Sequence, residues 1–160
     1  MASTLPGTAE RVSAHTSRAV NQRIRQDIEK SVTHHAYYPE EIDRRLEALD
    51  REWDIERTLE TNAATLALTG VLLGAFVDRR FLVLPAAVTA FLLQHALQGW
   101  CPPVPLFRRW GVRTAQEINE ERFALKALRG DFDGVARGHS SRRHLSRREV
   151  GSNALAAVRA

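Results

Sequence analysis

The chain has 160 residues, one cysteine and a net charge of +4, and its mean hydropathy is −0.31. This length suits one ordinary core with tails, and a single cysteine excludes an internal disulfide. The average polarity hides two runs without Asp, Glu, Lys or Arg, residues 61–77 and 81–107, between flanks that are dense in charge. Averages therefore do not exclude membrane segments. Most basic residues are interleaved with acidic ones, so the positive charge alone does not indicate a nucleic-acid partner.

The first part of the chain is predicted to be helical and polar. Residues 1–37 are expected to form a polar helical segment, with one helix from Thr8 to His35 that carries only a narrow apolar stripe. Such a stripe suits a partner helix or a membrane surface better than a full core.

A second, amphipathic helix is predicted over residues 38–60. Pro39 suits the first helical position, and two acidic residues follow it in the first turn. The helix is expected to continue almost directly into the first apolar run, with a bend near Asn62. Its apolar positions are spaced by four, three and four residues, namely Ile42, Leu46, Leu49 and Trp53.

Residues 61–100 contain the two apolar limbs of a predicted hairpin, joined by Asp78, Arg79 and Arg80. A buried soluble hairpin would need helices around it, and the flanks offer only narrow apolar faces. A membrane hairpin needs roughly 17 to 25 apolar residues in each limb, and both limbs are at the short end of that range. Snorkelling of the two arginines and local thinning of the bilayer would absorb the difference. We therefore favour a transmembrane hairpin.

Basic residues are concentrated on both flanks of this hairpin, whereas its tip has only Arg79 and Arg80. By the positive-inside rule, both termini are expected to face the cytoplasm. The first residues lack the apolar core of a secretory signal, so residues 1–60 are expected to stay on the side of synthesis. All but two of the 23 basic residues are arginine, which with the abundant alanine suggests a high-GC bacterial genome. The predicted location is the bacterial cytoplasmic (inner) membrane.

Small residues follow one face of the first limb: Ala63, Ala67, Gly70 and Gly74. Such a face lets two helix backbones approach closely within a membrane. It either packs against the second limb of the same hairpin or joins two copies of the chain, and the sequence leaves both readings open. In the second limb, Pro85 predicts a kink or a helix that starts only there.

The second limb ends in the membrane-exit motif Trp100, Cys101, Pro102 and Pro103, and residues 101–113 form a proline-rich exit segment. Thr114 and Glu117 then have the spacing of a capping box, and Gly130 is placed as a helix-ending glycine. A capped cytoplasmic helix is therefore predicted over residues 114–130. Residues 131–160 have little to bury and predict a disordered basic tail.

The order of these features resembles a known family. The resemblance rests on DIERTLETNAATLALTGVLLG, a short turn, a second apolar run, GWCPPVPLFRRWGVRT and EINEERFALKALRGDF, and is most specific at the Cys–Pro pair. The chain is similar to the two-helix inner-membrane domain at the C-terminus of bacterial membrane-anchored rhodaneses, which also occurs as stand-alone proteins of unknown function. The resemblance covers about residues 50–132 and implies an inner-membrane hairpin that dimerises through its helices.

Sulfurtransferase activity is not implied for this chain. The rhodanese domain has its own catalytic cysteine, and here no second cysteine exists. Residues 1–60 also lack the alternating strand and helix pattern that such a domain needs.

Cys101 is the candidate thiol of the sequence. It could carry a persulfide or bind a soft metal, with Arg108 and Arg109 lowering its pKa. The alternative, which we favour, is that a small apolar thiol fits the turn without any chemistry.

Three strongly polar side chains lie within the second limb, namely Gln94, His95 and Gln98. Polar groups at membrane depth are candidates for function because their desolvation is costly. His95 could belong to a proton or anion path. We favour a packing role, in which His95 donates to a backbone carbonyl or to Thr65 or Thr69 across the hairpin.

Two further basic features carry weaker hypotheses. His34 and His35 are adjacent and so point to different sides of a helix, and no spacing matches a closed zinc site; no metal or haem is predicted. The segment from Arg137 to Arg148 could touch anionic lipid or nucleic acid, and lipid is the simpler partner.

The predicted fold class is all-α: an integral membrane hairpin of two short transmembrane helices with flanking cytoplasmic amphipathic helices. The leading functional hypothesis is a non-enzymatic inner-membrane scaffold or accessory subunit. It would sit in membrane lipid as a homodimer or within a larger membrane complex, with no cofactor and no specific nucleic acid. The alternatives are a membrane component of sulfur handling or small-anion transport that uses Cys101 and His95, and a soluble basic helical adaptor.

Overall fold

The computed structural model describes residues 10–133, which contain helices and turns and no strand. The described chain divides into two compact units. Residues 10–27 and 52–118 form the first, which we call the hairpin unit, and residues 28–51 and 119–133 form the second. The all-helical class expected from the sequence is confirmed. The predicted basic tail lies outside the described residues, apart from the turn at 131–133.

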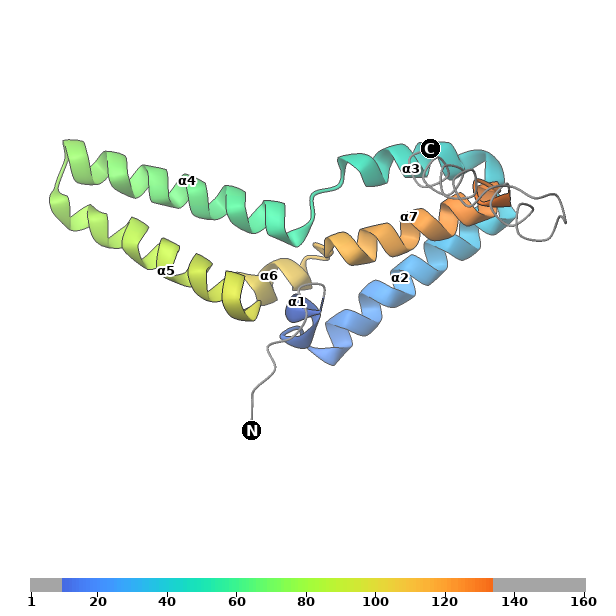
Figure 1. Ribbon diagram of the computed structural model, residues 1–160, viewed down its shortest axis with the longest axis horizontal. Coiled ribbons are helices and arrows are strands. Elements are labelled where there is room, and N and C mark those ends of the chain that lie inside the picture. The colour runs from blue at the N-terminus through green and yellow to red at the C-terminus, as the bar shows by residue number, and fades with distance from the viewer. Residues whose placement is uncertain (1–9, 134–160) are drawn as a thin grey trace, which may run out of the picture. The chain divides into compact units, whose positions relative to one another are not determined.

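The hairpin unit is built on two long antiparallel helices, α4 (Ile55–Phe76) and α5 (Val83–Gln98), shown in Figure 1. The short 3-10 helix η2 (Arg79–Leu82) joins them at the tip, where the Asp78 carboxylate accepts a hydrogen bond from the Arg80 N–H at 2.8 Å. At the other end, which we call the base of the hairpin, Gly99 ends α5 with φ of 74°. Glycine suits this position because other residues rarely adopt the left-handed conformation.

The bend predicted near Asn62 is wrong, because α4 is continuous through that residue. The chain breaks earlier, at residues 52–54, between α3 (Ile42–Arg51) and α4. Two interactions start a new helix at this point. The Asp54 carboxylate accepts from the Arg57 N–H at 2.8 Å, and the Ile55 N–H donates to the Arg113 carbonyl at 2.8 Å. An N-cap aspartate satisfies a backbone donor that an uninterrupted helix would bond internally.

The two limbs approach closely at two glycines. A Cβ atom on Gly70 would lie 2.5 Å from Pro85 Cδ, and one on Gly74 would lie 2.5 Å from Leu82 Cδ2. Gly70 and Gly74 of the small-residue face therefore pack against the second limb of the same hairpin. Pro85 lies in the first turn of α5, where its missing N–H breaks no helical hydrogen bond. The helix thus begins next to the proline, at Val83, close to the predicted start.

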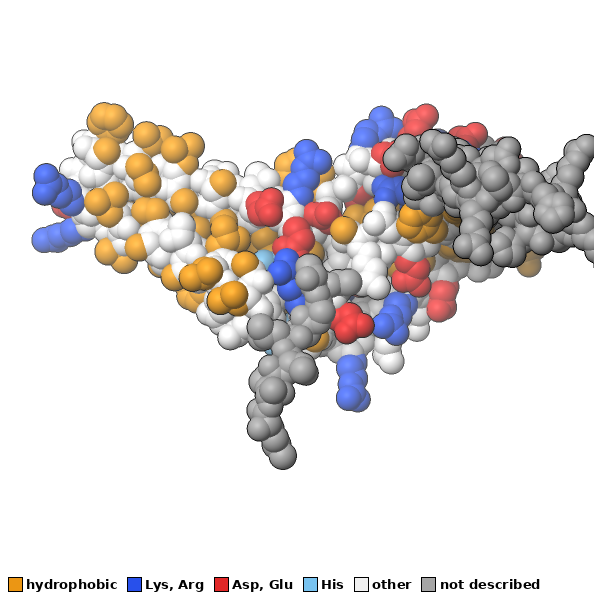
Figure 2. All heavy atoms as spheres, viewed as in Figure 1, with side chains coloured by type: hydrophobic (Ala, Val, Ile, Leu, Met, Phe, Trp, Pro, Cys, Tyr) orange, Lys and Arg blue, Asp and Glu red, His pale blue; other side chains and the backbone are white. Residues whose placement is uncertain are grey.

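Many large apolar side chains of both limbs are exposed, and Figure 2 shows such side chains along the face of the hairpin turned toward the viewer. By length and composition, two helical stretches could cross a membrane, and they contain α4 and α5. In the most apolar 18 residues of each stretch, only 17% and 6% are buried within the protein. A soluble core helix would be mostly buried. The charge-free part of α4, residues 61–76, is about 24 Å long at the usual helical rise, against a hydrocarbon layer of about 30 Å.

A small core lies at the base of the hairpin. Its buried members are Val12, Ile55, Leu59, Cys101 and Val104, with Phe107 and Val112 packed against them. They come from α1 (Arg11–Ala14), the start of α4, and α6 (Val104–Arg109) with its preceding turn. The core at the base of the hairpin thus includes residues from a segment that precedes the hairpin in the sequence, α1, and from one that follows it, α6 with its preceding turn.

The single helix predicted from Thr8 to His35 is wrong. The helix is interrupted at residues 15–17, which separate α1 from α2 (Arg18–Tyr37). Side chains bond the carbonyls that end α1: the Thr16 hydroxyl donates to the Val12 carbonyl at 2.8 Å, and the Asn21 amide donates to the Ser13 carbonyl at 2.9 Å. Short polar side chains often replace helical hydrogen bonds in this way.

The second unit contains η1 (Pro39–Glu41), α3, the later part of α2, and most of α7 (Ala115–Arg129). The predicted helix start at Pro39 is confirmed. Its apolar side chains include Ile28, Ile42, Leu46, Leu49 and Leu125, all buried. Glu121 is fully buried and paired: Arg45 donates to it through Nε at 2.8 Å and Nη2 at 2.9 Å.

Trp53 does not extend the apolar face of α3 as predicted. It is 46% exposed and lies in the break after Arg51, with the Arg57 guanidinium 4.3 Å from its ring centroid. Because α3 ends before it, Trp53 no longer follows the helical period of that face.

Both signals predicted for the ends of α7 are confirmed. The Thr114 N–H donates to the Glu117 carboxylate at 2.8 Å, and the Glu117 N–H donates to the Thr114 hydroxyl at 3.2 Å. Gly130 follows the helix with φ of 89°.

Candidate functional site at the base of the hairpin

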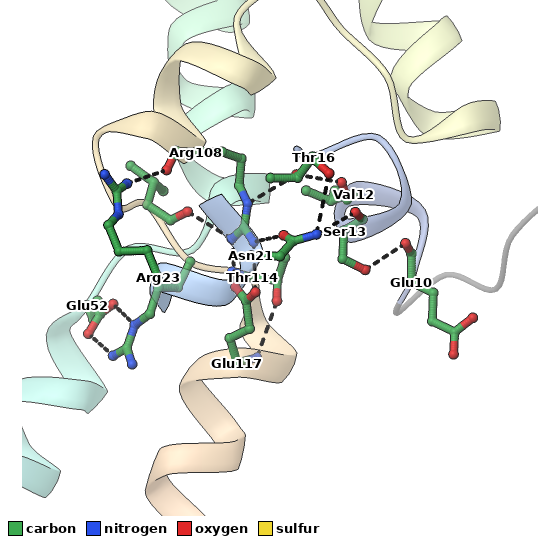
Figure 3. A network of polar contacts seen from close by, with 12 residues as sticks. Glu10, Val12, Ser13, Thr16, Asn21, Arg23, Glu52, Arg108, Thr114 and Glu117 are labelled. Carbon is green, nitrogen blue, oxygen red and sulfur yellow. Dashed lines mark hydrogen bonds and ion pairs between the residues drawn. The ribbon is translucent and has the colours of Figure 1, made fainter. Parts of the chain in front are cut away.

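A buried arginine organises the polar part of the base (Figure 3). The Arg108 guanidinium is 0% exposed and binds both oxygens of the Glu117 carboxylate, at 2.6 and 2.7 Å. It also donates to Asn21 Oδ1 at 3.0 Å, to the Val112 carbonyl at 3.1 Å and to the Thr16 hydroxyl at 3.3 Å. A buried charge is stable only when it is paired and its remaining hydrogen-bonding capacity is satisfied. Arg108 therefore ties the turn between α1 and α2 to the segment after the hairpin.

Glu117 is adapted to this pairing. Burial alone would raise the pKa of its carboxyl, but hydrogen bonds from Arg108 and from the Thr114 N–H outweigh burial, and the pKa is lowered. The same carboxylate thus completes the capping box of α7 and neutralises the buried arginine.

Two more arginines fasten the base. Arg113 donates to the Glu52 carboxylate from Nε at 2.7 Å and from Nη2 at 2.5 Å. Arg23 donates to the Arg109 carbonyl at 2.7 Å, at the end of α6. These contacts join segments that are far apart in the sequence.

A second polar cluster crosses the base of the hairpin itself. His95 Nε2 on α5 lies 2.8 Å from Glu56 Oε2 on α4, and Arg11 Nη2 lies 3.1 Å from Glu56 Oε1. Arg11 also donates to the Ala96 carbonyl at 2.9 Å. The cluster therefore links α1 to both limbs of the hairpin.

The predicted partners of His95 are wrong. The Thr65 and Thr69 hydroxyls donate to carbonyls of their own helix, at 2.7 and 2.8 Å, and His95 binds Glu56 instead. The physical reason is the carboxylate, which is a stronger acceptor for an imidazole N–H than a hydroxyl or a carbonyl.

Glu56 fixes the proton on the imidazole of His95. Glu56 lies before the charge-free run of α4. Burial alone would raise the pKa of its carboxyl, but hydrogen bonds from His95 and Arg11 outweigh burial, and the pKa is lowered. An ionised carboxylate only accepts hydrogen bonds, so His95 Nε2 carries the proton. In the neutral ring, Nδ1 is then an acceptor. This atom is buried and has no hydrogen-bond partner among residues 10–133.

A cavity of about 220 Å³ lies beside this cluster. It lies between the base halves of α4 and α5 and the exit segment, and it is partly open to the outside. Its lining is apolar except at Asn62, His95 and Cys101; the other lining residues are Leu59, Ala63, Leu66, Val88, Phe91, Leu92, Pro102, Pro103 and Phe107.

Cys101 faces both the core and this cavity and is 7% exposed. Burial raises the pKa of its thiol, so the predicted lowering by Arg108 and Arg109 is wrong. Arg108 has its charge neutralised by Glu117 and does not stabilise a thiolate. A protonated, buried thiol is a small apolar group rather than a nucleophile.

The other predicted site residues fall in different places. Gln94 is half-buried, Gln98 is exposed and Trp100 is half-buried, while Pro102 and Pro103 line the cavity. Of the small-residue face, Gly70 and Gly74 are buried and Ala63 and Ala67 are half-buried.

The adjacent histidines are engaged separately. His34 Nε2 lies 3.0 Å from a Glu41 carboxylate oxygen, and His35 Nδ1 lies 2.7 Å from the Ser31 carbonyl. No group of three or more His, Cys, Asp or Glu side chains within residues 10–133 could hold a metal ion.

Several residues of the base were not predicted from the sequence. Arg11 and Glu56 act through partners 45 and 39 residues away in the chain. Glu117 was predicted only as part of the capping box, and its pairing with Arg108 was not. One signal was present for Glu56, because an acidic residue shortly before an apolar run needs a cationic or polar partner. For Arg11 there was none.

Comparisons of the chain with protein families, with characterised proteins and with solved structures found no match. The resemblance to the membrane domain of rhodaneses thus stays a prediction.

Proposed function

We propose that the chain is a non-enzymatic membrane scaffold or accessory subunit of the bacterial inner membrane, inserted through the hairpin of α4 and α5. The exposure of the hairpin carries this proposal, because most of its apolar surface has no covering within the described residues. Large exposed side chains occur on both limbs, among them Leu68, Phe76 and Val83 at 60%, 83% and 71%. Exposed apolar surface of this extent marks membrane or protein contact.

The polar side chains of the limbs fit a lipid environment. Thr65 and Thr69 on α4 and Thr89 on α5 each donate to a carbonyl four residues earlier, so their hydroxyls are satisfied within the helix. Arg79 and Arg80 lie at the tip, where they would reach the far interface. Within the hairpin unit, the charged pairs of Arg11 with Glu56, Arg113 with Glu52 and Arg108 with Glu117 lie at the base, where the chain would meet the cytoplasm.

We place both termini on the cytoplasmic side. The support is the excess of arginine on the flanks of the hairpin over its tip. Glu52 with Arg113 and Glu117 with Arg108 gather charge on this same end of the hairpin.

The role of the polar base is anchorage of the N-terminal segment. Arg108 and Arg11 bind this segment to the exit segment and to the hairpin through several contacts. Association with another copy or with a larger membrane complex would use the outer faces, since Gly70 and Gly74 are covered by the second limb.

The experiment is extraction of the native protein from its own membrane, first with alkaline carbonate and then with a mild detergent. We expect the protein to resist carbonate, and to leave the membrane with detergent as a dimer or with a reproducible set of partners. The partners are identified by mass spectrometry. Recovery in the soluble fraction under carbonate would overturn membrane insertion, and a monomer without partners would overturn the scaffold role.

A further inference from the structure

The exit helix α6 follows the second limb of the hairpin closely (Figure 1), with only residues 99–103 between α5 and α6. The charge-free run continues through these residues to Phe107, so the apolar sequence does not end with the limb. Arg108 comes next, but it is fully buried and paired with Glu117. Arg109 is therefore the first exposed charge after the tip of the hairpin.

Buried contacts determine which side of α6 is exposed. Val104 is 0% exposed and belongs to the core of the base, and the Arg108 side chain points to the turn between α1 and α2 (Figure 3). The opposite side has Leu106 at 47% exposure and Trp110 at 69%, beside Arg109. Residues four apart are neighbours on a helix, so the leucine and the tryptophan form one apolar patch next to the arginine.

This apolar patch adjoins the limbs of the hairpin. The ring centroids of Trp110 and Phe107 lie 5.8 Å apart, and Phe107 lines the cavity between the base halves of α4 and α5. At about 100° per residue, Trp110 lies about 60° round the helix from Phe107, and Arg109 lies about 160° round it. The apolar side of α6 is thus nearer the limbs than the cationic side, as in helices that lie at a membrane interface.

The Arg109 side chain is available for a partner outside the chain. Its guanidinium makes no hydrogen bond or ion pair with any part of residues 10–133, and only its carbonyl is bonded, by Arg23 at 2.7 Å. A guanidinium can donate two parallel hydrogen bonds to one phosphate group. The contact with Arg23 holds the end of α6 in place while the charged group stays exposed.

The tryptophans of the chain indicate the depth of this end of the hairpin. All three lie on its flanks and none on a limb: Trp53 before α4, Trp100 after α5 and Trp110 after α6. Tryptophan is enriched at membrane interfaces, where its ring lies at the level of the headgroups. The base of an inserted hairpin is therefore expected at that level.

We propose that the exposed side of α6 binds anionic phospholipid: Leu106 and Trp110 enter the boundary between headgroups and acyl chains, and the Arg109 guanidinium binds the lipid phosphate. An anionic lipid fits best because a zwitterionic headgroup has its own cation beside the phosphate. A second copy related by twofold symmetry would instead bring two arginines together. This inference rests on the membrane insertion proposed above.

The test uses the full chain in vesicles of phosphatidylcholine and phosphatidylglycerol, with bromine on one lipid at a time. Trp53→Phe and Trp100→Phe leave Trp110 as the only tryptophan, and bromine quenches a tryptophan that it contacts. We expect stronger quenching by bromine near the headgroup than by bromine at the end of the acyl chain. Phosphatidylglycerol should be enriched roughly fivefold around Trp110, as expected for one arginine at an anionic surface.

Substitutions of single arginines provide the matched control. Arg109→Gln should remove the enrichment of phosphatidylglycerol, and Arg109→Lys should keep most of it. Arg25→Gln removes the same charge from an exposed position on α2 and should leave the enrichment unchanged. Enrichment that persists in Arg109→Gln would overturn the proposal. Equal losses in Arg109→Gln and Arg25→Gln would also overturn it, because net charge alone would then explain the enrichment.

A separate variant reports insertion of the hairpin. Leu68 is 60% exposed on α4, so Leu68→Trp with Trp110→Phe in the same background should be quenched best by bromine at the chain end. If this variant is quenched while Trp110 is shielded from every brominated lipid, lipid binding by α6 is overturned and membrane insertion stands. If neither tryptophan is quenched, both are overturned.

Discussion

His95 on α5 and Glu56 on α4 are joined by a hydrogen bond of 2.8 Å at the base of the hairpin. The pair joins the two helices at the base of the hairpin. Nearer the tip, Gly70 and Gly74 let the same two helices approach closely. Because Arg11 binds the other carboxylate oxygen, the same pair also fastens the N-terminal segment.

The first prediction concerns pH. The carboxyl of Glu56 has a lower pKa in the folded protein than its ordinary value of 4.5, so folding favours its ionised form. Its contribution to the free energy of unfolding is therefore complete above about pH 4.5 and is lost as the pH falls through the lowered pKa. Thermal unfolding of the native protein and of Glu56→Gln should differ by roughly 1 kcal/mol at pH 7 and converge at acidic pH. A constant difference across this range would contradict the pairing.

The second prediction concerns the buried arginine. Arg108→Ala leaves the Glu117 carboxylate buried and unpaired, so we expect a loss of about 3 to 5 kcal/mol of unfolding free energy. The neighbouring Arg109 is exposed, and Arg109→Ala should change stability by less than about 0.5 kcal/mol. Chemical denaturation followed by circular dichroism measures both. Similar losses in the two variants would show that Arg108 is not the organising residue.

The third prediction concerns the glycines of the hairpin. A methyl group on Gly70 meets the rigid ring of Pro85 at 2.5 Å, whereas one on Gly74 meets the flexible end of Leu82. Both alanine substitutions gain helix propensity of about 1 kcal/mol, but overpacking costs about 1 to 3 kcal/mol. Gly70→Ala should therefore lower the melting temperature more than Gly74→Ala does. The reverse order would argue that the limbs do not pack through these residues.

The fourth prediction concerns the thiol. Because burial protects Cys101 and raises its pKa, a maleimide should modify it at least about tenfold more slowly in the folded than in the unfolded protein. Cys101→Ala should retain the fold, since the side chain contributes apolar contact. Rapid modification of the folded protein at neutral pH would instead support a reactive thiol.

Short-range signals predicted the helix ends well. The capping box at Thr114, the glycine at position 130 and the proline at position 39 each act on their own neighbours, so the residues themselves contain the needed information. The two apolar limbs were evident because charge is absent from whole runs. Their helical form is confirmed, and their place in a membrane remains a proposal.

Long-range polar contacts were beyond the sequence patterns. The break before α4 depends on the Arg113 carbonyl, which accepts the Ile55 N–H, and the partner of His95 lies at the start of the other limb. The interruption at residues 15–17 depends on Asn21 reaching back to Ser13. Periodicity identifies which positions are apolar, but it does not say which of several carboxylates a given cation or imidazole will meet.

The most direct test of membrane insertion is accessibility of the hairpin tip from outside intact cells. In a Cys101→Ser background, Arg79→Cys places one thiol at the tip and Glu29→Cys places one on exposed α2. With a membrane-impermeant maleimide, we predict labelling of Arg79→Cys in intact spheroplasts and labelling of Glu29→Cys only after lysis. Equal protection of both positions before lysis, or labelling of Glu29→Cys alone, would contradict a hairpin that crosses the membrane with both ends in the cytoplasm.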